Sequence, residues 1–266
     1  MNEIDELHDY LIRLNLPRMA ELYETEANRA AQMKLSYSGY LNRLVAEELL
    51  AKTDRSIKHR LRKARFPVLK TIEGFDFTLQ PAVNELQIKE LAELGFLTTS
   101  ENVLLLGPPG VGKTHLAIGL GVKACMMRKR VNFVSALVLL DELMAAVAIK
   151  NLAARLEELS RLDLLIIDEL GYLPMDKGRA NLFFQLVNRC YERTSIIIST
   201  NRAFNQWGEV LGDEVIAGAV LDRLLHHGHI IAIQGESYRI RGKLRPEGKP
   251  VLDRKGAIGD NSTEPK

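Results

Sequence analysis

The sequence is poor in the features that mark secreted or membrane-bound chains. Among its 266 residues there are only two cysteines and one tryptophan, and Cys125 and Cys190 stand far apart. Two isolated cysteines argue against a disulfide framework or a zinc site, and they fit a reducing compartment. The N-terminus is acidic where a signal peptide would be basic, and the longest apolar stretch is interrupted by Asp141 and Glu142. We therefore expect a cytoplasmic protein with no membrane-spanning segment.

The first part of the chain carries apolar residues at helical spacing. Helices are predicted over residues 3–14, over 18–31, from a Ser36 cap to about residue 49, and over about 54–65. Pro17 is expected to end the first helix, and Pro67 to close the module. Residues 1–66 are therefore predicted to form a small all-α N-terminal domain.

Positive charge is concentrated in the last of these helices. The net charge of the whole chain is only +2, so an affinity for polyanions must come from local clustering. Seven lysines and arginines, against one acid, lie between residues 52 and 65. The predicted helix exposes Arg55, Lys58, Arg62 and Arg65 on its outer side. This face is either merely solvated, as charge runs often are, or a contact surface for DNA phosphates.

Apolar runs alternate with helical stretches in the rest of the chain, which is typical of a parallel α/β sheet. Five strands are predicted, at about 102–106, 131–136, 162–169, 194–200 and 229–233, with a pair of helices over 136–161. The core domain is predicted to span residues 67–242, and residues 243–266, which lack an apolar period, to form a flexible tail.

Residues 102–115, NVLLLGPPGVGKTH, carry the strongest motif. Gly107, Gly112, Lys113 and Thr114 fill the pattern G-x-x-x-x-G-K-[ST] between a predicted strand and a predicted helix. Glycines let the backbone N–H groups curl around phosphates, the lysine reaches the β- and γ-oxygens, and the threonine hydroxyl can bind Mg²⁺. The candidate nucleotide-binding residues are Gly107, Pro108, Pro109, Gly110, Val111, Gly112, Lys113, Thr114 and His115.

Two carboxylates follow the third predicted strand. Asp168 and Glu169 emerge at its carboxyl end, where ligands bind in open α/β sheets. Asp168 is positioned to hold Mg²⁺ through water, and Glu169 to polarise a water molecule for attack on the γ-phosphate. Asn201, after the fourth strand, either orients the same water or simply forms a turn.

Arginines near the end of the predicted core are further candidates. Arg223 either reaches a γ-phosphate across a subunit boundary or forms a local salt bridge, for example with Asp222. Arg239 or Arg241, after the last strand, could reach the phosphates within the same subunit.

Two phenylalanines and a group of histidines are interpreted as structural residues and not as ligand-binding ones. Phe75 and Phe77, in the connector after Pro67, could flank a base, but we favour anchors that dock the connector on the core. A metal site at His226, His227 and His229 is not expected, because adjacent histidines point in different directions on a helix.

Five segments together extend the signal beyond the phosphate-binding loop: GPPGVGKTHLA, LLIIDELGY, STNRAFNQW, LDRLLHHGH and GESYRIR. With the basic helix ending in RKARFP and the connector, they resemble the IstB-type ATPases, the transposition helpers of bacterial insertion sequences. The resemblance covers nearly the whole chain except the tail. It implies an AAA+ ATPase of the initiator type, related to the DnaC and DnaI helicase loaders, whose N-terminal helices engage DNA or a transposase.

The resemblance also implies roles for single residues. Gly107 to Thr114 match Walker A, Asp168 and Glu169 match Walker B, and Asn201 matches sensor I. Arg223 matches the arginine finger and Arg239 the second sensor, while the helices over 136–161 match the initiator-specific insertion that lines a DNA channel. Val111 replaces a frequent threonine, at a position expected to contribute backbone.

We therefore predict an ATP- and Mg²⁺-dependent ATPase that multimerises on double-stranded DNA, with ATP sites at subunit interfaces, and presents target DNA to a transposase. A replicative helicase loader shares nearly every motif. A small-molecule kinase is disfavoured, because the acids and Asn201 are suited to positioning water and not to excluding it. A nucleotide-gated binding module that hardly hydrolyses ATP is the remaining alternative.

Overall fold

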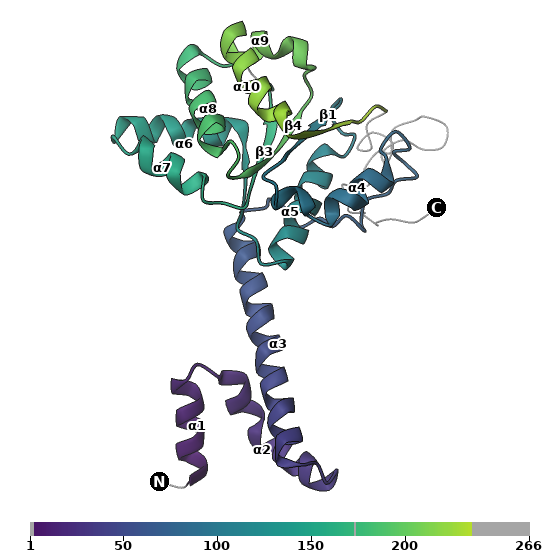
Figure 1. Ribbon diagram of the computed structural model, residues 1–266, viewed down its shortest axis with the longest axis vertical. Coiled ribbons are helices and arrows are strands. Elements are labelled where there is room, and N and C mark those ends of the chain that lie inside the picture. Colours follow the sequence, from purple (N-terminus) through teal and green to yellow (C-terminus); the bar gives the residue numbers. More distant parts are fainter. Residues whose placement is uncertain (1–2, 173, 236–266) are drawn as a thin grey trace, which may run out of the picture.

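The computed structural model describes residues 3–172 and 174–235, with side chains described from residue 6 onward. An α/β core sits at one end of a long helix, and two shorter helices pack near the other end (Figure 1). The N-terminal helices are α1 (Glu3–Arg13), α2 (Pro17–Gln32) and α3 (Tyr37–Lys63). They enclose a small core of their own, formed by Leu11, Met19, Ala20, Tyr23 and Leu44. The predicted helical N-terminal region is confirmed.

Helix α3 corrects the prediction of two separate helices between residues 36 and 65. The hydroxyl of Ser36 accepts a hydrogen bond from Gly39 N at 3.2 Å, so the predicted cap is present. From there the helix continues without interruption to Lys63, because no proline and no glycine follow Gly39 within it. The residues between the two predicted helices, about 50–53, belong to the same helix. One rigid element therefore connects the N-terminal helices to the core.

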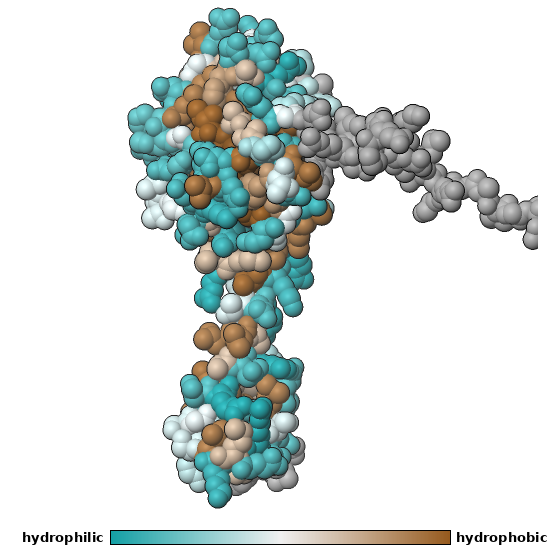
Figure 2. All heavy atoms as spheres, turned by 90° about the vertical axis from the view of Figure 1, so that its right-hand side faces the viewer, coloured by the Kyte–Doolittle hydropathy of each residue, from teal (hydrophilic) through white to brown (hydrophobic). Residues whose placement is uncertain are grey.

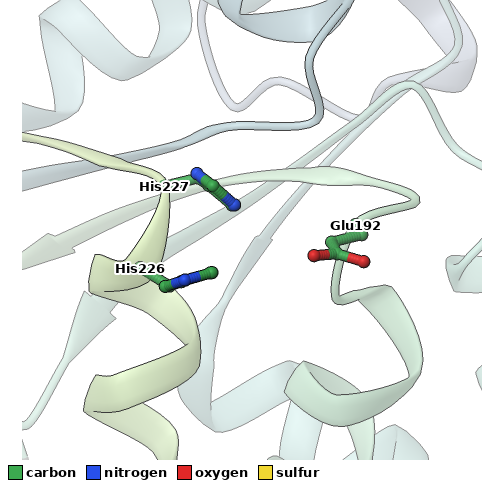
Figure 3. Close-up of side chains that lie close together, drawn as sticks. All are labelled: Glu192, His226 and His227. Atoms are coloured by element: carbon green, nitrogen blue, oxygen red, sulfur yellow. The ribbon is translucent and has the colours of Figure 1, made fainter.

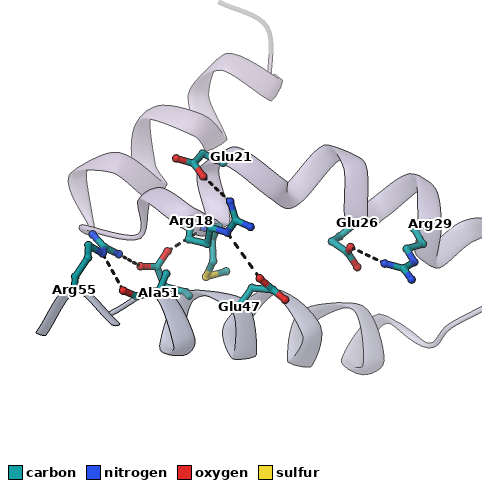
Figure 4. Close-up of polar contacts among 9 residues, drawn as sticks. Arg18, Glu21, Glu26, Arg29, Glu47, Ala51 and Arg55 are labelled. Carbon is teal, nitrogen blue, oxygen red and sulfur yellow. Dashed lines mark hydrogen bonds and ion pairs between the residues drawn. The ribbon is translucent and has the colours of Figure 1, made fainter. Parts of the chain in front are cut away.

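Pro17 was predicted to end the first helix. In the structure it is the first residue of α2. Proline suits the first turn of a helix because its missing N–H would have no partner there. The cap residue Leu16 offers no side-chain acceptor, and the carboxylate of Glu48 on α3 accepts from Met19 N at 3.0 Å instead. Figure 4 shows the neighbouring pairs between α2 and α3, including Arg18 with Glu47. The N-terminus of α2 is thus capped by a side chain of α3.

The core contains a five-stranded parallel sheet, as predicted. The strands are β1 (Asn102–Leu106), β2 (Val131–Ser135), β3 (Leu164–Leu170), β4 (Ser195–Thr200) and β5 (Gly228–Ala232). Their order is β2-β3-β4-β1-β5, and every pair is parallel. Three central strands are buried on both faces, which explains their continuous apolar sequences. Their carboxyl ends meet at one edge, where Leu106 of β1 pairs with Thr200 of β4.

Helices cover both faces of the sheet (Figure 1). One face carries α4 (Glu85–Ala92), α5 (Lys113–Met126) and the end of α3, where Ala64 is fully buried. The other face carries α6 (Ala136–Ala148), α7 (Leu152–Leu159), α8 (Lys177–Cys190), α9 (Trp207–Leu211) and α10 (Glu214–His226). The predicted pair over 136–161 corresponds to α6 and α7. The core is therefore a three-layer arrangement with the sheet in the middle.

Both cysteines are free and buried in this core. Burial raises the pKa of the Cys125 thiol to about 11 and that of Cys190 to about 12. Over the described ranges, none of the helices combines the length and the apolar character needed to span a bilayer.

Candidate nucleotide-binding site

The loop between β1 and α5 has a backbone that only glycine accommodates easily. Gly110 and Gly112 have φ angles of +84° and +100°. A Cβ atom on Gly112 would lie 2.5 Å from Cε2 of Phe75, and one on Gly107 would lie 2.2 Å from the carbonyl oxygen of Ile233. These glycines serve two purposes, since they allow the curl of the loop and let its neighbours approach closely.

Lys113 begins α5 and its ammonium lies inside the curl of the loop. Its Nζ donates to the carbonyl oxygens of Gly107 at 2.7 Å and of Pro108 at 2.8 Å. The N-terminus of a 14-residue helix lies at the same place, so a partial positive charge and a lysine converge there. This combination is suited to binding the phosphates of a nucleotide.

Thr114 and Asp168, which are 54 residues apart in the sequence, are in direct contact. The Thr114 hydroxyl lies 3.0 Å from both carboxylate oxygens of Asp168. Asp168 is 6% exposed, so its carboxylate depends on such donors. Hydroxyl and carboxylate oxygens are the hard ligands that Mg²⁺ prefers, so these two residues fit the predicted metal site.

Ser199 links the two acids of β3 and was not among the predicted site residues. Its hydroxyl donates to Asp168 and accepts from Glu169 N at 3.0 Å. Glu169 has a φ angle of +60° at an irregularity in the pairing of β3 with β4, and its side chain is exposed. A positive φ is unusual for glutamate. Here it turns the carboxylate away from the sheet at the edge that carries the loop.

Asn201 follows the last residue of β4 at this same edge. Thr200 pairs with Leu106 and with Leu170, and its carbonyl accepts from Gly107 N at 3.2 Å. The structure thus brings the ends of β1, β3 and β4 together, as predicted from the parallel sheet. Asn201 is exposed, and its role in orienting water stays a prediction.

A cavity of about 340 Å³ adjoins the loop and is lined by the loop and by the connector. The connector side includes Val68, Lys70, Phe75, Asp76 and Gln80. Its size and its position beside the phosphate-binding backbone suit the base and sugar of a nucleotide. Sequence reasoning considered only Phe75 among these residues, as a ring that could flank a base, and it missed the others because the connector shows no nucleotide-binding pattern of its own.

Phe75 and His115 hold the connector against the loop. The ring of Phe75 is 8% exposed and lies edge-on to Phe77 at 4.9 Å and to His115 at 5.3 Å. His115 Nε2 lies 2.9 Å from the carbonyl oxygen of Thr71. The interpretation of Phe75 and Phe77 as anchors is confirmed. Val111 contributes more than backbone, since its side chain is fully buried in the core.

Arg223 on α10 is bound within its own chain. Its Nε donates to Asn188 Oδ1 and its Nη1 to the carbonyl oxygen of Ala219, both at 3.0 Å, and the guanidinium lies 5.1 Å from the Phe184 ring centre. The suggested alternative of a salt bridge with Asp222 is not what the described part of the chain shows. Arg239 and Arg241 lie outside the described residues.

The four candidate DNA-binding side chains are all exposed, but they differ in their partners. Arg55 donates to Glu48 Oε1 at 2.9 Å, and Arg65 to Glu142 Oε1 at 3.4 Å. Lys58 and Arg62 form no ion pair with any described residue. Two of the four cations are therefore already committed to carboxylates.

A second group of possible metal ligands lies away from the loop. Ligand atoms of Glu192, His226 and His227 lie within 4.8 Å of one another, and all three side chains are exposed (Figure 3). The expectation that the adjacent histidines diverge is wrong, because α10 ends at His226 and the chain then turns, leaving the ring centres 4.1 Å apart. His226 Nδ1 also lies 2.8 Å from the Tyr191 hydroxyl.

Comparison with known proteins gives close relatives. The model of the family of IstB-like ATP-binding proteins matches residues 10–246. The chain is 47% identical over 240 residues to an ATP-binding protein of insertion sequence IS21 from Pseudomonas aeruginosa, covering 90% of this chain and 91% of that one. It is 44% identical over 245 residues to the corresponding protein of IS5376 from Geobacillus stearothermophilus, covering 92% and 98%.

Solved structures share the fold at low sequence identity. DnaA from Aquifex aeolicus bound to AMPPCP matches with a TM-score of 0.54 and 20% identity, over 66% of this chain and 57% of that one. DnaI matches with a TM-score of 0.51 and 18% identity, over 63% and 89%. The predicted α/β fold with its parallel five-stranded sheet is thereby confirmed.

Proposed function

This chain belongs to the family of IstB-like ATP-binding proteins, and from that premise we propose that it is a cytoplasmic ATPase that assembles on double-stranded DNA and delivers target DNA to a transposase. The observation that carries the hydrolytic part is the linked set of Thr114, Asp168, Ser199 and Glu169 beside the phosphate-binding loop. A site that only bound nucleotide would not need the exposed acid beside the buried one.

The chemistry divides among these residues. The loop and Lys113 bind the phosphates, and Thr114 and Asp168 would hold Mg²⁺, which when bound offsets charge on the β- and γ-phosphates. Glu169 accepts a proton from the attacking water, and Asn201 orients that water. Arg223 donates to the γ-phosphate of a neighbouring subunit, which places the active site between subunits.

The proposal that DNA and a transposase are partners draws on the insertion-sequence relatives and on the basic face of α3. A replicative helicase loader is the second candidate, favoured by the fold shared with DnaI. The two are separated by adding purified chain to strand-transfer reactions of a transposase encoded beside it, and to helicase-loading reactions. A helper stimulates the first reaction, and a loader stimulates the second.

The experiment that tests hydrolysis compares wild type with Glu169→Gln and with the control Glu93→Gln, which changes an exposed acid after α4. Glu169→Gln should bind ATP normally, because the loop, Lys113 and Asp168 remain. It should lose roughly 10²–10⁴-fold in turnover, the usual contribution of a general base. Near-wild-type turnover at saturating ATP would show that another group activates the water.

A further inference from the structure

A basic groove lies where α3 meets the core, and the nucleotide site does not include it. Its volume is about 620 Å³, and it is lined by the last turns of α3, the loop before β2, and α7. The cations in its lining include Arg60, Arg62, Lys63, Lys129, Arg130 and Arg155. Because they come from three segments of the chain, the folded structure concentrates more charge here than the basic run of α3 alone supplies.

Some of these cations are neutralised within the chain. Arg155 donates to Glu142 and to Glu158, each at 2.6 Å, and Arg130 donates to Asp163 at 3.1 Å. Arg60, Arg62, Lys63 and Lys129 form no ion pair with any residue in the described ranges. Lys129 lies close enough to the Asp163 carboxylate to help lower its pKa, whereas the charges of Arg60, Arg62 and Lys63 repel one another unless an anion joins them.

Arg60 is not fully satisfied within the chain. Its Nε atom is buried and has no hydrogen-bond partner among the described residues. A buried donor without an acceptor costs free energy, and more so when the group is charged. Because this atom is buried, a phosphate in the groove would meet the Arg60 guanidinium through its other nitrogens.

We propose that this groove binds the phosphodiester backbone of DNA through Arg60, Arg62, Lys63 and Lys129. This assignment rests on the proposed function and changes its DNA-binding set. Arg55 and Arg65 are engaged by Glu48 and Glu142, so they contribute less than the outer face of the helix suggested. The binding surface belongs jointly to the N-terminal helices and to the ATPase core.

The joint that forms the groove is fixed by close contacts. Phe133 N on β2 donates to the carbonyl oxygen of Ala64 at 2.8 Å, and the rings of Phe66 and Phe133 lie 6.0 Å apart. Lys129 follows α5, whose first residue is Lys113 of the nucleotide loop. A helix of 14 residues is about 21 Å long, so DNA in the groove does not touch the nucleotide.

The chemistry of the groove favours a nucleic acid over an acidic protein segment. Of its apolar members, Val131 and Leu159 are buried, at 6% and 1% exposure, and only Leu162 is half-buried, so the groove offers little to anchor a peptide side chain. Protein interfaces obtain most of their affinity from such anchors. A surface of arginine and lysine without anchors is typical of contacts to phosphates.

The test is the salt dependence of binding to double-stranded DNA in the full chain. The groove variant combines Arg62→Gln and Lys63→Gln, at exposed positions, with Lys129→Gln, at a half-buried position. The control variant combines Arg13→Gln, Lys34→Gln and Arg193→Gln, which removes the same charge from exposed positions elsewhere. Loss of three phosphate contacts should lower the slope of log K against log salt by up to about 2.7, roughly 0.9 for each contact. The control should keep the wild-type slope, and ATP binding should be unchanged in both.

The possible failures are distinguishable. If wild type does not bind DNA, the proposed function itself fails. If wild type binds and the groove variant keeps the wild-type slope, DNA lies elsewhere and the groove assignment is overturned. If the groove variant keeps its DNA affinity but loses transposase binding, the occupant is a protein and the assignment is equally overturned.

Discussion

Ser199 is the residue on which the geometry of the two acids depends. A single hydroxyl donates to the carboxylate of Asp168 and accepts from the backbone N–H of Glu169. The N–H bond supports the positive φ angle of Glu169, a conformation that costs of order 1–3 kcal/mol when unsupported. A small side chain therefore sets the position of both the metal ligand and the candidate base.

Ser199→Ala should lower turnover more than it lowers ATP affinity. The phosphate-binding loop is untouched, whereas the carboxylate of Glu169 loses its fixed direction, and a misplacement of about 1 Å can cost on the order of 10²-fold in rate. Turnover and nucleotide affinity measured on the same preparations give the comparison. Ser195→Ala is the matched control, because Ser195 lies on the same strand but donates to Phe96 at the opposite end. Equal losses of turnover in both variants would mean that the strand, and not the site, is affected.

The sequence predicted some residues of the site and not others, for a physical reason. Thr114 and Asp168 could be assigned because each follows a recognisable strand, and the carboxyl ends of parallel strands meet. The contact of Phe75 with Gly112 joins two segments without a shared motif, and only the folded chain shows it. Ser199 could not be assigned, because its hydrogen bonds depend on the register of β3 with β4.

Among the helices, α3 holds the N-terminal region together through a buried charge. Glu48 is 3% exposed, and its carboxylate accepts hydrogen bonds from Met19 N in the first turn of α2 and from the Arg55 guanidinium. A carboxylate at the N-terminus of a helix is favoured by the helix dipole. Two helices were predicted here, whereas α3 packs against α2 as one continuous helix. This is why the helix boundary could not be predicted from the sequence.

Glu48→Ala should destabilise the N-terminal helices by about 1–3 kcal/mol. The change leaves Met19 N without an acceptor and Arg55 without its buried partner. Hydrogen exchange of the α2 amides would report the local loss. Glu47→Ala is the control, because Glu47 is only half-buried and pairs with Arg18 at the long distance of 3.8 Å. Exchange rates in α2 that match between the two variants would contradict a capping role for Glu48.

The ion pair between Asp163, just before β3, and Arg130, just before β2, makes the stability of the fold depend on pH. Burial acts to raise the pKa of Asp163, but the hydrogen bonds from the Arg130 side chain and backbone lower it more, so the folded pKa lies below the ordinary 3.8. A depressed carboxylate pKa stabilises the fold above the ordinary value, and this contribution is lost as the pH falls through the folded value. Asp163→Asn should therefore lower the free energy of unfolding at neutral pH. The difference in this free energy between the variant and wild type should become smaller at acidic pH.

Urea unfolding at neutral and at acidic pH measures the difference in free energy of unfolding between Asp163→Asn and wild type. Asp54→Asn removes an exposed acid of α3 and controls for the change in net charge. A gap that stays constant with pH would show that Asp163 acts through packing alone.

The molecule as a whole has a broad head and a smaller body joined by a narrow neck (Figure 2). The α/β head was predictable because its apolar runs are local and strong, whereas the length of the neck follows from the continuity of α3. The nucleotide site lies at one edge of the sheet, and Arg223 lies on α10 near the opposite end of β5. Arg223 and the nucleotide site of the same subunit lie at opposite ends of the strands. We therefore expect Arg223 to act on the nucleotide of a partner subunit.

The guanidinium of Arg223 is held in place by two hydrogen bonds, but not all of its N–H donors are used. Asn188 and Ala219 accept from Nε and Nη1, and within the described residues Nη2 has no hydrogen-bond partner. We expect activity to rise with protein concentration and with DNA that gathers subunits, because a neighbour's arginine acts only when two subunits meet. Arg223→Ala should abolish that rise, whereas ATP binding to the monomer should survive.

Mixing two inactive proteins gives the sharper test of an active site shared between subunits. Arg223→Ala retains Lys113 and Glu169, and Glu169→Gln retains Arg223, so a junction between them can contain one complete site. Hydrolysis should recover in the mixture and should not recover when the second protein also carries Arg223→Ala. The double variant is the control, because it assembles without supplying any arginine. If the mixture stays inactive although both proteins are shown to share the same DNA, Arg223 acts within its own subunit or supports the packing of α8, and the proposal of sites between subunits loses its main support.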